Sequence, residues 1–349
     1  MGVGAMPDSR MFAEIREQPE VLERILEEGW DEILSATRDL RRGDLRLVMI
    51  AARGTSDNAA LYAKYLFEVL LGVPVALASP SSFTLYESRM NLDGVLVVGI
   101  SQSGESQDVL ETIRRSGELG ADTLTLTNDE GSAMAQVAQH HLFLRAGREE
   151  SVAATKTYTA ELMTLYLLVS ALKGEESPDD GARRLPGLLR GVLEAEWEGT
   201  ERYRYADYMV VTSRGYNLAT AEEAALKLME TTYIVAQAFS AADLRHGPIA
   251  MIGRDFPVLA IAPSGRAQPG MEALVENLGD RGAELVVVSD ERTMLGKASA
   301  RFHMPESPHE DLSPIACAIP IQLLAENLAR LKGLNPDAPR GLSKVTETW

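Results

Sequence analysis

Three charged side chains recur at helical spacing in the segment that begins near Ala221. Glu223, Lys227 and Glu230 occupy positions i, i+4 and i+7, so they project from one face of a helix. A charged helix face usually contacts solvent. Here the opposite flank is apolar, which indicates a packed helix: Ala224, Ala225, Leu228 and Met229. A positioned carboxylate beside an ammonium group can accept and return a proton, so this face could perform general acid–base chemistry.

A second candidate site is a loop rich in hydroxyl groups. It lies between a strand pattern at 95–100 and a helical pattern at 108–119, and it contains Ser101, Gln102, Ser103 and Ser106. Such a loop presents hydroxyls and free backbone N–H groups to an anion at the positive end of a helix dipole. Thr55 and Ser56 hold the equivalent position after the first strand pattern, so they could close the same pocket. The alternative is that serine and glutamate only cap the helix.

The common motifs of nucleotide and metal sites are missing from the sequence. Neither G-x-G-x-x-G nor G-x-x-x-x-G-K-[ST] follows a strand pattern, so a single sugar phosphate fits the hydroxyl loop better than a dinucleotide or a triphosphate. The five histidines are scattered without an H-E-x-x-H pair, and the single cysteine, Cys317, excludes an internal disulfide. We therefore expect no metal and no redox cofactor.

The charge and hydropathy of the chain limit its partners. A formal net charge of -17 repels polyanions, which argues against nucleic acid and acidic lipid as partners. The apolar runs are shorter than the roughly 20 residues that span a bilayer, and residues 1–9 lack the pattern of a secretory signal. We expect a cytoplasmic protein that acts on a small molecule.

The elements that carry the candidate residues alternate between strand and helix patterns. Apolar runs predict strands at 45–52, 73–78, 95–100 and 123–127, with helical patterns between them. This alternation predicts an α/β fold with a doubly wound, mainly parallel sheet and helices on both faces. Ligands bind such sheets at the carboxyl ends of the strands, where the hydroxyl loop lies.

The same short sequence steps after strand patterns occur twice along the chain. Arg53-Gly54 after the first strand pattern is echoed by Arg214-Gly215 after a strand pattern at 208–213. Ser103-Gly104 is likewise echoed by Ser264-Gly265 after a strand pattern at 257–262. Recurrence at a nearly constant offset predicts two tandem units of the same fold.

The repeat also suggests where the units begin and end. The stretch 173–186 is rich in Gly, Glu, Asp and Pro and is expected to be a connection, with a helix at 188–201 leading into the second unit. We expect an N-terminal helical segment at 1–42, the first unit at 43–187, the second unit at 188–334 and a C-terminal tail at 335–349.

Six sequence strings resemble the sugar isomerase (SIS) domain family. In the family's order they are A-R-G-T-S, G-I-S-Q-S-G-E-S, V-A-A-T-K, E-E-A-A-L-K-L-M-E, L-R-H-G-P and P-R-G-L-S-K-V-T. Within the family, the chain resembles the isomerase half of the glucosamine-6-phosphate synthases. The resemblance implies that the substrate phosphate contacts Thr55, Ser56, Ser101, Gln102, Ser103 and Ser106. It implies that the sugar site includes Val152, Ala153, Lys156 and Glu223.

The resemblance also assigns roles in proton transfer. Interconversion of an aldose and a ketose moves a proton between neighbouring carbons, and Glu230 matches the family's carboxylate in that role. Lys227 would anchor the open-chain substrate or tune this carboxylate. His246 would open the sugar ring in the active site of a neighbouring subunit, so we expect a homodimer. Lys344, in a stretch that composition alone would describe as a frayed tail, would meet the substrate carbonyl.

The chain departs from the synthases at its start. The first strand pattern begins at Leu45 without a preceding cysteine, so a glutaminase domain with a cysteine nucleophile is not expected. We expect the deaminating direction, from glucosamine 6-phosphate to fructose 6-phosphate and ammonia, as in the stand-alone deaminases of the family, which the chain also resembles at Ala154 and Arg245. Arg53 replaces a small residue of the synthases, and it either alters the pocket or adds a phosphate contact.

Two other enzymes and one binding protein remain as alternatives. The enzymes are a fructosamine 6-phosphate deglycase and an ammonia-dependent isomerising aminotransferase, since the motifs fix the reaction class better than the leaving amine. The third alternative is a sugar-phosphate sensor without turnover. Retention of Glu230, His246 and Lys344 argues against the sensor, because a binding module needs no groups for proton transfer.

Overall fold

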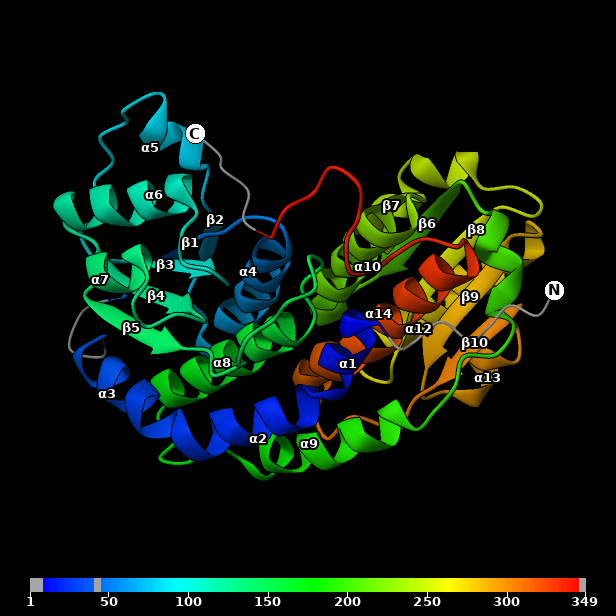
Figure 1. Ribbon diagram of the computed structural model, residues 1–349, viewed down its shortest axis with the longest axis horizontal. Helices are drawn as coiled ribbons and strands as arrows, with labels where there is room; N and C mark the ends of the chain where they lie inside the picture. Colours follow the sequence, from blue (N-terminus) through cyan, green and yellow to red (C-terminus); the bar gives the residue numbers. More distant parts are fainter. Residues whose placement is uncertain (1–8, 41–44, 345–349) are drawn as a thin grey trace.

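The computed structural model describes residues 9–40 and 45–344. These residues form two α/β lobes, each built on a five-stranded parallel sheet with helices on its faces (Figure 1). The prediction of an α/β fold with two tandem units of one kind is confirmed. Residues 1–8, 41–44 and 345–349, which include parts of the predicted N-terminal segment and tail, lie outside the described residues.

The first sheet has the strand order β2-β1-β3-β4-β5. Its strands are β1 (Leu47–Ala51), β2 (Val75–Leu77), β3 (Val95–Ser101), β4 (Asp122–Thr127) and β5 (His140–Phe143). The four predicted apolar runs correspond to β1 to β4. The strand β5 has only one buried residue, Leu142, so no apolar run in the sequence predicted this strand.

The second sheet has the order β10-β9-β8-β6-β7. Its strands are β6 (Tyr208–Ser213), β7 (Val235–Ser240), β8 (Pro257–Ile261), β9 (Glu284–Ser289) and β10 (Ala300–His303). From the β7 edge, this order repeats that of the first sheet, strand for strand. In each sheet the direction of winding reverses between the first and third strands, β1 and β3 or β6 and β8. In doubly wound folds, the crevice at such a switch point is the usual place for a ligand.

The helices of the first half begin before its sheet and continue beyond it. They are α1 (Arg10–Arg16), α2 (Gln18–Glu28), α3 (Trp30–Leu40), α4 (Thr55–Leu66), α5 (Pro80–Thr84), α6 (Gln107–Glu118), α7 (Ala133–Val137) and α8 (Lys156–Lys173), with a π-helical turn at Phe67–Leu71 after α4. The α1 N-terminus is fixed by Ser9, whose hydroxyl accepts a hydrogen bond from Phe12 N at 3.0 Å.

The helices of the second half are α9 (Asp180–Leu193), α10 (Leu218–Thr232), α11 (Ala241–Arg245), α12 (Gln268–Asp280), α13 (Arg292–Leu295) and α14 (Ser313–Leu331). Short 3₁₀ turns lie at Thr200–Tyr205, Gly215–Asn217, Pro248–Met251 and Glu310–Leu312. The α9 bounds correct two expectations, because the helix occupies much of the expected connection at 173–186 and ends before 201. Its start is set by Asp179, whose side chain accepts a hydrogen bond from Ala182 N at 3.0 Å.

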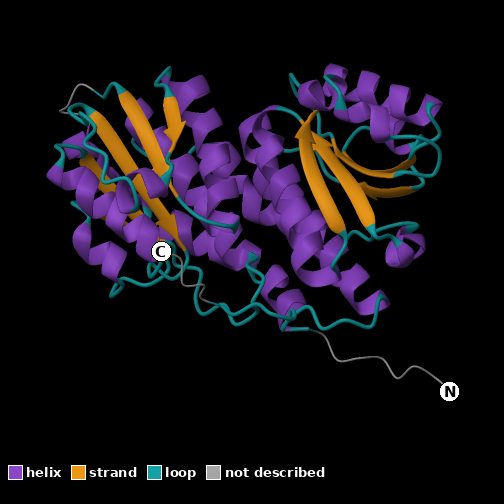
Figure 2. Ribbon diagram, turned by 90° about the horizontal axis from the view of Figure 1, so that it is seen from above, coloured by secondary structure: helices purple, strands orange, loops and turns teal. Residues whose placement is uncertain are grey.

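A layer of helices joins the two sheets into one body. Figure 2 shows the sheets on either side of this layer, and α4, α8, α10 and α14 pack against one another within it. One continuous cluster of buried apolar residues includes residues of both sheets and of these helices. The segment Glu310–Leu331 is long and apolar enough to cross a membrane, but 89% of its most apolar window is buried inside the protein. In this structure α14 is therefore a core helix.

Candidate active site

A cavity of about 340 Å³ lies at the carboxyl ends of β1 and β3, at the switch point of the first sheet. It also receives residues from α8, from α10 of the second lobe and from the tail. Its lining residues are Arg53, Gly54, Thr55, Ser56, Ser101, Gln102, Ser103, Ser106, Val152, Ala154, Thr157, Glu161, Glu230, Leu342, Ser343 and Lys344. The cavity therefore combines hydroxyl, carboxyl and ammonium groups from segments far apart in the sequence.

Two helix N-termini face this cavity. α4 begins after Gly54, whose φ of 57° and ψ of -130° suit glycine, and α6 begins after Ser106. Within the described residues, neither terminus has a side-chain cap hydrogen bond. The capping alternative therefore does not account for the Ser106 hydroxyl, which lies 3.4 Å from Ser101 Oγ. Free N–H groups and hydroxyls together can bind an anion such as phosphate.

The loop at 101–106 is held in shape by its own hydroxyls. Ser101 Oγ accepts a hydrogen bond from Gly104 N at 3.1 Å, and Ser103 Oγ accepts one from Glu105 N at 3.3 Å. Gly104 has a φ of 68°, and a Cβ at this position would lie 2.3 Å from Ser132 Oγ. A side chain is therefore excluded at this turn.

The position of Arg53 answers part of the question that the sequence left open. Its Nε donates to Asp108 Oδ2 at 2.7 Å, and a second guanidinium nitrogen lies 2.5 Å from the same oxygen. Asp108 belongs to the first turn of α6, so the pair ties the two loops of the cavity together. The Arg53 side chain is 49% exposed and still lines the cavity.

The ammonium group of Lys227 is completely buried and has three acceptors. Its Nζ lies 2.6 Å from Glu230 Oε2, 2.9 Å from Thr55 Oγ1 and 3.2 Å from Glu223 Oε1. An ammonium group has three N–H donors, so these contacts satisfy all of them. Glu223 also accepts a hydrogen bond from Asn58 Nδ2 at 2.8 Å. Lys227 therefore fixes Glu230 relative to the N-terminus of α4.

Burial and pairing act in opposite directions on this cluster. Burial disfavours the Lys227 ammonium, but the Glu223 and Glu230 carboxylates outweigh it and raise the pKa of Lys227 above its usual value. Burial raises the pKa of Glu223, although the Lys227 charge opposes the shift. Glu230 is the more exposed carboxylate, with 22% of its side chain accessible, and it alone of these three residues lines the cavity.

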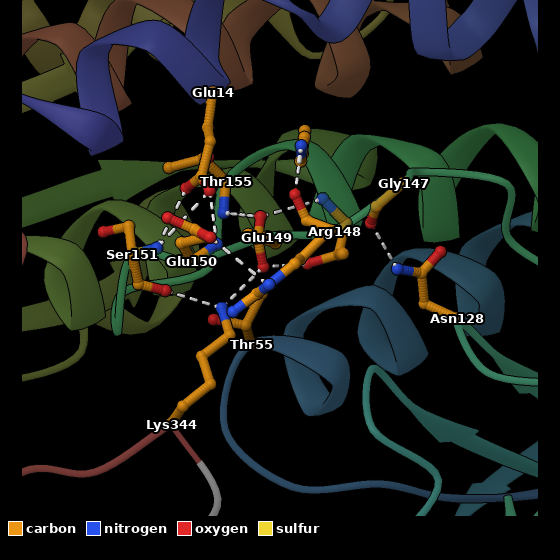
Figure 3. A network of polar contacts seen from close by, with 12 residues as sticks. Glu14, Thr55, Asn128, Gly147, Arg148, Glu149, Glu150, Ser151, Thr155 and Lys344 are labelled. Carbon is orange, nitrogen blue, oxygen red and sulfur yellow. Dashed lines mark hydrogen bonds and ion pairs between the residues drawn. The ribbon is translucent and has the colours of Figure 1, made fainter.

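The C-terminal tail covers one side of the cavity. Lys344 Nζ donates to Glu149 Oε2 at 2.9 Å and to Ser151 O at 2.6 Å. Figure 3 shows the Lys344 side chain reaching from the tail toward these two residues. Burial opposes ionisation of the Glu149 carboxyl, but Lys344 and the Thr155 N–H outweigh it and lower the Glu149 pKa. The tail is thus attached by an ion pair at a buried carboxylate.

The loop that receives the tail is itself fixed by carboxylates. Glu14 accepts hydrogen bonds from the backbone N–H groups of Glu150 and Ser151, as seen in Figure 3. Glu149 Oε1 accepts from Thr155 N at 2.8 Å and from Thr157 N at 3.2 Å. These bonds satisfy backbone donors at the start of α8 and position the residues after them along the cavity.

The structure brings nine of the fourteen predicted site residues to the cavity wall. The nine are Thr55, Ser56, Ser101, Gln102, Ser103, Ser106, Val152, Glu230 and Lys344. Glu223 and Lys227 lie behind the wall and contact Glu230 or Thr55. Ala153 is buried next to the lining residues Val152 and Ala154 but is not part of the lining.

Two predicted residues lie elsewhere in this structure. Lys156 Nζ donates to Glu17 Oε2 at 2.6 Å and to Arg148 O at 2.7 Å, so its charge holds α2 against the 148–155 loop. His246 is exposed at the end of α11 and does not line the cavity. The predicted contacts of Lys156 and His246 with substrate therefore remain predictions.

Sequence reasoning missed several lining residues, of which Thr157 and Glu161 stand out. They occupy positions i and i+4 on α8, so they share a helix face that starts just after the V-A-A-T-K string. That spacing was a usable signal. The uninterrupted apolar character of the rest of α8 obscured it, because the pattern favoured an ordinary core helix.

The second lobe has no comparable cavity at its own switch point. The space there is about 10 Å³. After β8, Ser264 donates to Asp290 through both its backbone N–H and its hydroxyl, and Ala267 N donates to Glu310 Oε1 at 3.4 Å. Carboxylates thus take the donors that an anion would use at this switch point.

In the part of the chain that the structure describes, no group of three or more His, Cys, Asp or Glu side chains is arranged to hold a metal ion. The sequence-based expectation that activity needs no metal or redox cofactor remains a prediction for measurement.

Comparisons with known proteins agree on one family. The family model "SIS domain" matches residues 45–171 and 203–331. The chain is 36% identical over 345 residues to a glutamine–fructose-6-phosphate aminotransferase (isomerizing) of Methanothermobacter thermautotrophicus. That match covers 97% of this chain but 57% of the relative, so the chain spans little more than half of the relative's length.

Two solved structures resemble the whole two-lobed body. The C-terminal domain of glucosamine-fructose-6-phosphate aminotransferase from Francisella tularensis matches with a TM-score of 0.85 and 26% identity, over 97% of this chain and 100% of that domain. A protein from Silicibacter pomeroyi DSS-3, provisionally named a phosphosugar isomerase, matches with a TM-score of 0.85 and 32% identity, over 95% of this chain and 100% of its own.

Proposed function

Because the chain belongs to the SIS domain family, we propose that it is a sugar-phosphate isomerase that acts on a 6-phosphorylated amino sugar. The proposed reaction converts glucosamine 6-phosphate and water into fructose 6-phosphate and ammonia. The observation that carries the proposal is that Glu230 and the hydroxyl loops share one cavity, although they come from different lobes. The protein is proposed to work in the cytoplasm as a homodimer.

The hydroxyl loops would hold the substrate through its phosphate. The N-termini of α4 and α6 supply N–H groups and positive dipole ends, and Ser101, Ser103 and Ser106 supply hydroxyls. This grip does not depend on the overall charge of the chain, which is strongly negative. An anion fixed at this end of the cavity would place the other end of the sugar chain near α10 and the tail.

Glu230 would perform the proton transfer. In open-chain glucosamine 6-phosphate, a base removes the proton from C2 and returns it to C1, while a proton passes from the amine to the C1 oxygen, which leaves a hydroxyl at C1 and an imine at C2. Water then hydrolyses the imine to the ketose and releases ammonia. Glu230 reaches the cavity, and Lys227 holds its Oε2 at 2.6 Å, so the carboxylate is preorganised for this role.

Lys344 and His246 would complete the site. Lys344 lies at the cavity wall and could stabilise the developing negative charge on the substrate oxygen. His246 is exposed, as a side chain donated to a neighbouring subunit must be before assembly. We propose that it assists ring opening in the partner subunit's cavity.

Whether the proposed site releases or adds ammonia depends on the concentration of free ammonia. When free ammonia is dilute, mass action favours its release over its addition to fructose 6-phosphate. This reasoning makes deamination the reaction to measure first, while a high ammonia concentration should drive the same site toward glucosamine 6-phosphate.

The test is release of ammonia from a panel of matched compounds by the purified protein. Glucosamine 6-phosphate should release ammonia, and unphosphorylated glucosamine should not do so at the same concentration. Release of an amine only from fructosamine 6-phosphates would favour the deglycase. Binding of sugar phosphates without turnover of any compound in the panel would refute the enzyme and favour the sensor.

A further inference from the structure

Glu161 is a buried carboxyl group in the cavity wall that the proposed reaction does not use. It lies on α8, is 1% exposed and lines the cavity. Its Oε1 accepts a hydrogen bond from Ser56 Oγ at 2.7 Å. Its Oε2 is buried and has no hydrogen-bond partner among the described residues. A buried polar atom without a partner is costly, so this oxygen calls for a ligand or a function.

Burial is the main cause that disfavours a negative charge on Glu161, and the neighbouring groups divide in their effect. Glu223 on α10 and Glu149 in the 148–155 loop repel it, while Lys227 on α10 and the Ser56 hydroxyl on α4 favour it. Lys227 already shares its three N–H groups among other acceptors. Burial dominates this balance and raises the pKa of Glu161 to about 8. At neutral pH the side chain is therefore mainly a neutral acid with an O–H group.

We infer that Glu161 is a substrate-binding residue whose neutral carboxyl donates a hydrogen bond to an oxygen of the bound sugar phosphate. The inference rests on the proposed function, because it requires a sugar phosphate in this cavity. Ser56 donates to one carboxyl oxygen, and the other has no hydrogen-bond partner among the described residues. A protonated oxygen is a donor and a carboxylate is not, so only the neutral acid fits beside a phosphorylated ligand.

The sign of the pH dependence follows from this role. Below its pKa, Glu161 is neutral and binds the ligand; above it, the carboxylate repels the ligand phosphate and loses its donor. Bound ligand therefore favours the protonated form, and affinity should fall as the pH rises through about 8. The expected loss approaches tenfold for each pH unit above that point, until the carboxyl also ionises in the complex.

Tyr158 provides a matched control on the same helix. Its hydroxyl is also buried without a hydrogen-bond partner in the described residues, and it interacts electrostatically with Glu161, but it does not line the cavity. Tyr158 shares the buried, unpartnered oxygen but not the position at the cavity wall. A change in ligand binding that arises only from altered packing on α8 should therefore appear in a Tyr158 variant as well. The inference requires that Tyr158→Phe leave ligand binding unchanged.

The experiment measures binding of fructose 6-phosphate by calorimetry between pH 6.5 and 9.5. This ligand has no amine, and its phosphate is already fully ionised over most of the range. The proteins are the wild type, Glu161→Gln, Glu161→Met and Tyr158→Phe, each with a thermal melt at every pH. Glutamine keeps an acceptor for Ser56 and supplies a permanent N–H donor, while methionine keeps only the volume.

The expected results distinguish the inference from the proposed function. The wild type and Tyr158→Phe should bind fructose 6-phosphate with equal affinity, and this affinity should fall above pH 8. Glu161→Gln should bind as tightly at pH 9 as at pH 7. Glu161→Met should bind about tenfold more weakly than the wild type at pH 7. The inference is overturned if Glu161→Gln weakens above pH 8 as the wild type does, or if Glu161→Met binds normally. Failure of the wild type to bind fructose 6-phosphate at any pH would instead overturn the proposed function, and the inference with it.

Discussion

Replacement of Lys227 by methionine removes the buried ammonium group that joins Glu223, Glu230 and Thr55, and nearly conserves the volume of the side chain. The change breaks three contacts: with Glu223 at 3.2 Å, with Glu230 at 2.6 Å and with Thr55 at 2.9 Å. Glu223 is 0% exposed, and the change removes its buried counterion. Removing one member of a buried ion pair costs about 3–5 kcal/mol, whereas a surface pair is worth about 0–1 kcal/mol. We expect Lys227→Met to lose about 3–5 kcal/mol of unfolding free energy at pH 8.

The loss should be smaller at pH 5 than at pH 8. Lys227 lowers the pKa of Glu223, so its removal raises that pKa further above the already raised value in the folded protein. The folded state then binds more protons than the unfolded state, and its stability falls as the pH rises through the folded-state pKa. Below its raised folded-state pKa, Glu223 is neutral in the fold and carries no unpaired charge, and below the unfolded-state pKa of about 4.3 the difference in protonation between the two states disappears.

The assay is unfolding by urea, followed by circular dichroism, for wild type, Lys227→Met, Glu223→Gln and the double variant. In the double variant no charge is left unpaired at Glu223, so it should be at least about 2 kcal/mol more stable than the sum of the single effects predicts. A loss below about 1 kcal/mol in Lys227→Met, or strict additivity in the double variant, would refute the proposed buried cluster.

Three further changes test the cavity, the tail and the cofactor expectation. The double variant Ser101→Ala with Ser103→Ala should raise the KM for glucosamine 6-phosphate about tenfold or more and leave kcat nearly unchanged, since hydrogen bonds to charged groups contribute about 1.5–3 kcal/mol. An equal fall of kcat would argue against a phosphate-binding role. Lys344→Met should lower kcat at least tenfold and make the bond after Arg340 more accessible to trypsin, because Glu149 and Ser151 O lose their partner; unchanged kcat would remove Lys344 from the site. Prolonged treatment with a chelator should leave activity unchanged, and a loss that Zn²⁺ or Mg²⁺ restores would disprove the expectation of metal-independent chemistry.

The sequence predicted the inner strands, which are almost completely buried, and the edge strand β2, which lies within the apolar run 73–78. β3 is buried along its whole length and reads as a continuous apolar run, and the repeated Arg-Gly and Ser-Gly steps marked the duplication. The other three edge strands, β5, β7 and β10, were not predicted, because they alternate between buried and exposed positions or contain polar residues. The bounds of α9 were wrong because Pro186 and the acidic stretch before it indicated a connection, whereas Asp179 caps a helix there.

The site was predictable where a short string carries the chemistry. The hydroxyl loops and Glu230 fall at strand ends or on a helix face, and these positions follow from local spacing. The roles of Lys156 and Glu161 were not predictable, since their surroundings depend on how α2, α4 and α10 pack against α8. Lys156, in a conspicuous motif, pairs with Glu17 in this structure, and Glu161, in a core helix, lines the cavity.

In the proposed reaction, Glu230 is the base that moves the substrate proton. The decisive measurement is ammonia release from glucosamine 6-phosphate by Glu230→Gln, made together with binding of fructose 6-phosphate to the same protein. We predict that release falls by at least about a thousandfold while the dissociation constant stays within about threefold of the wild-type value. Release near the wild-type rate with binding intact would contradict the proposed role of this carboxylate.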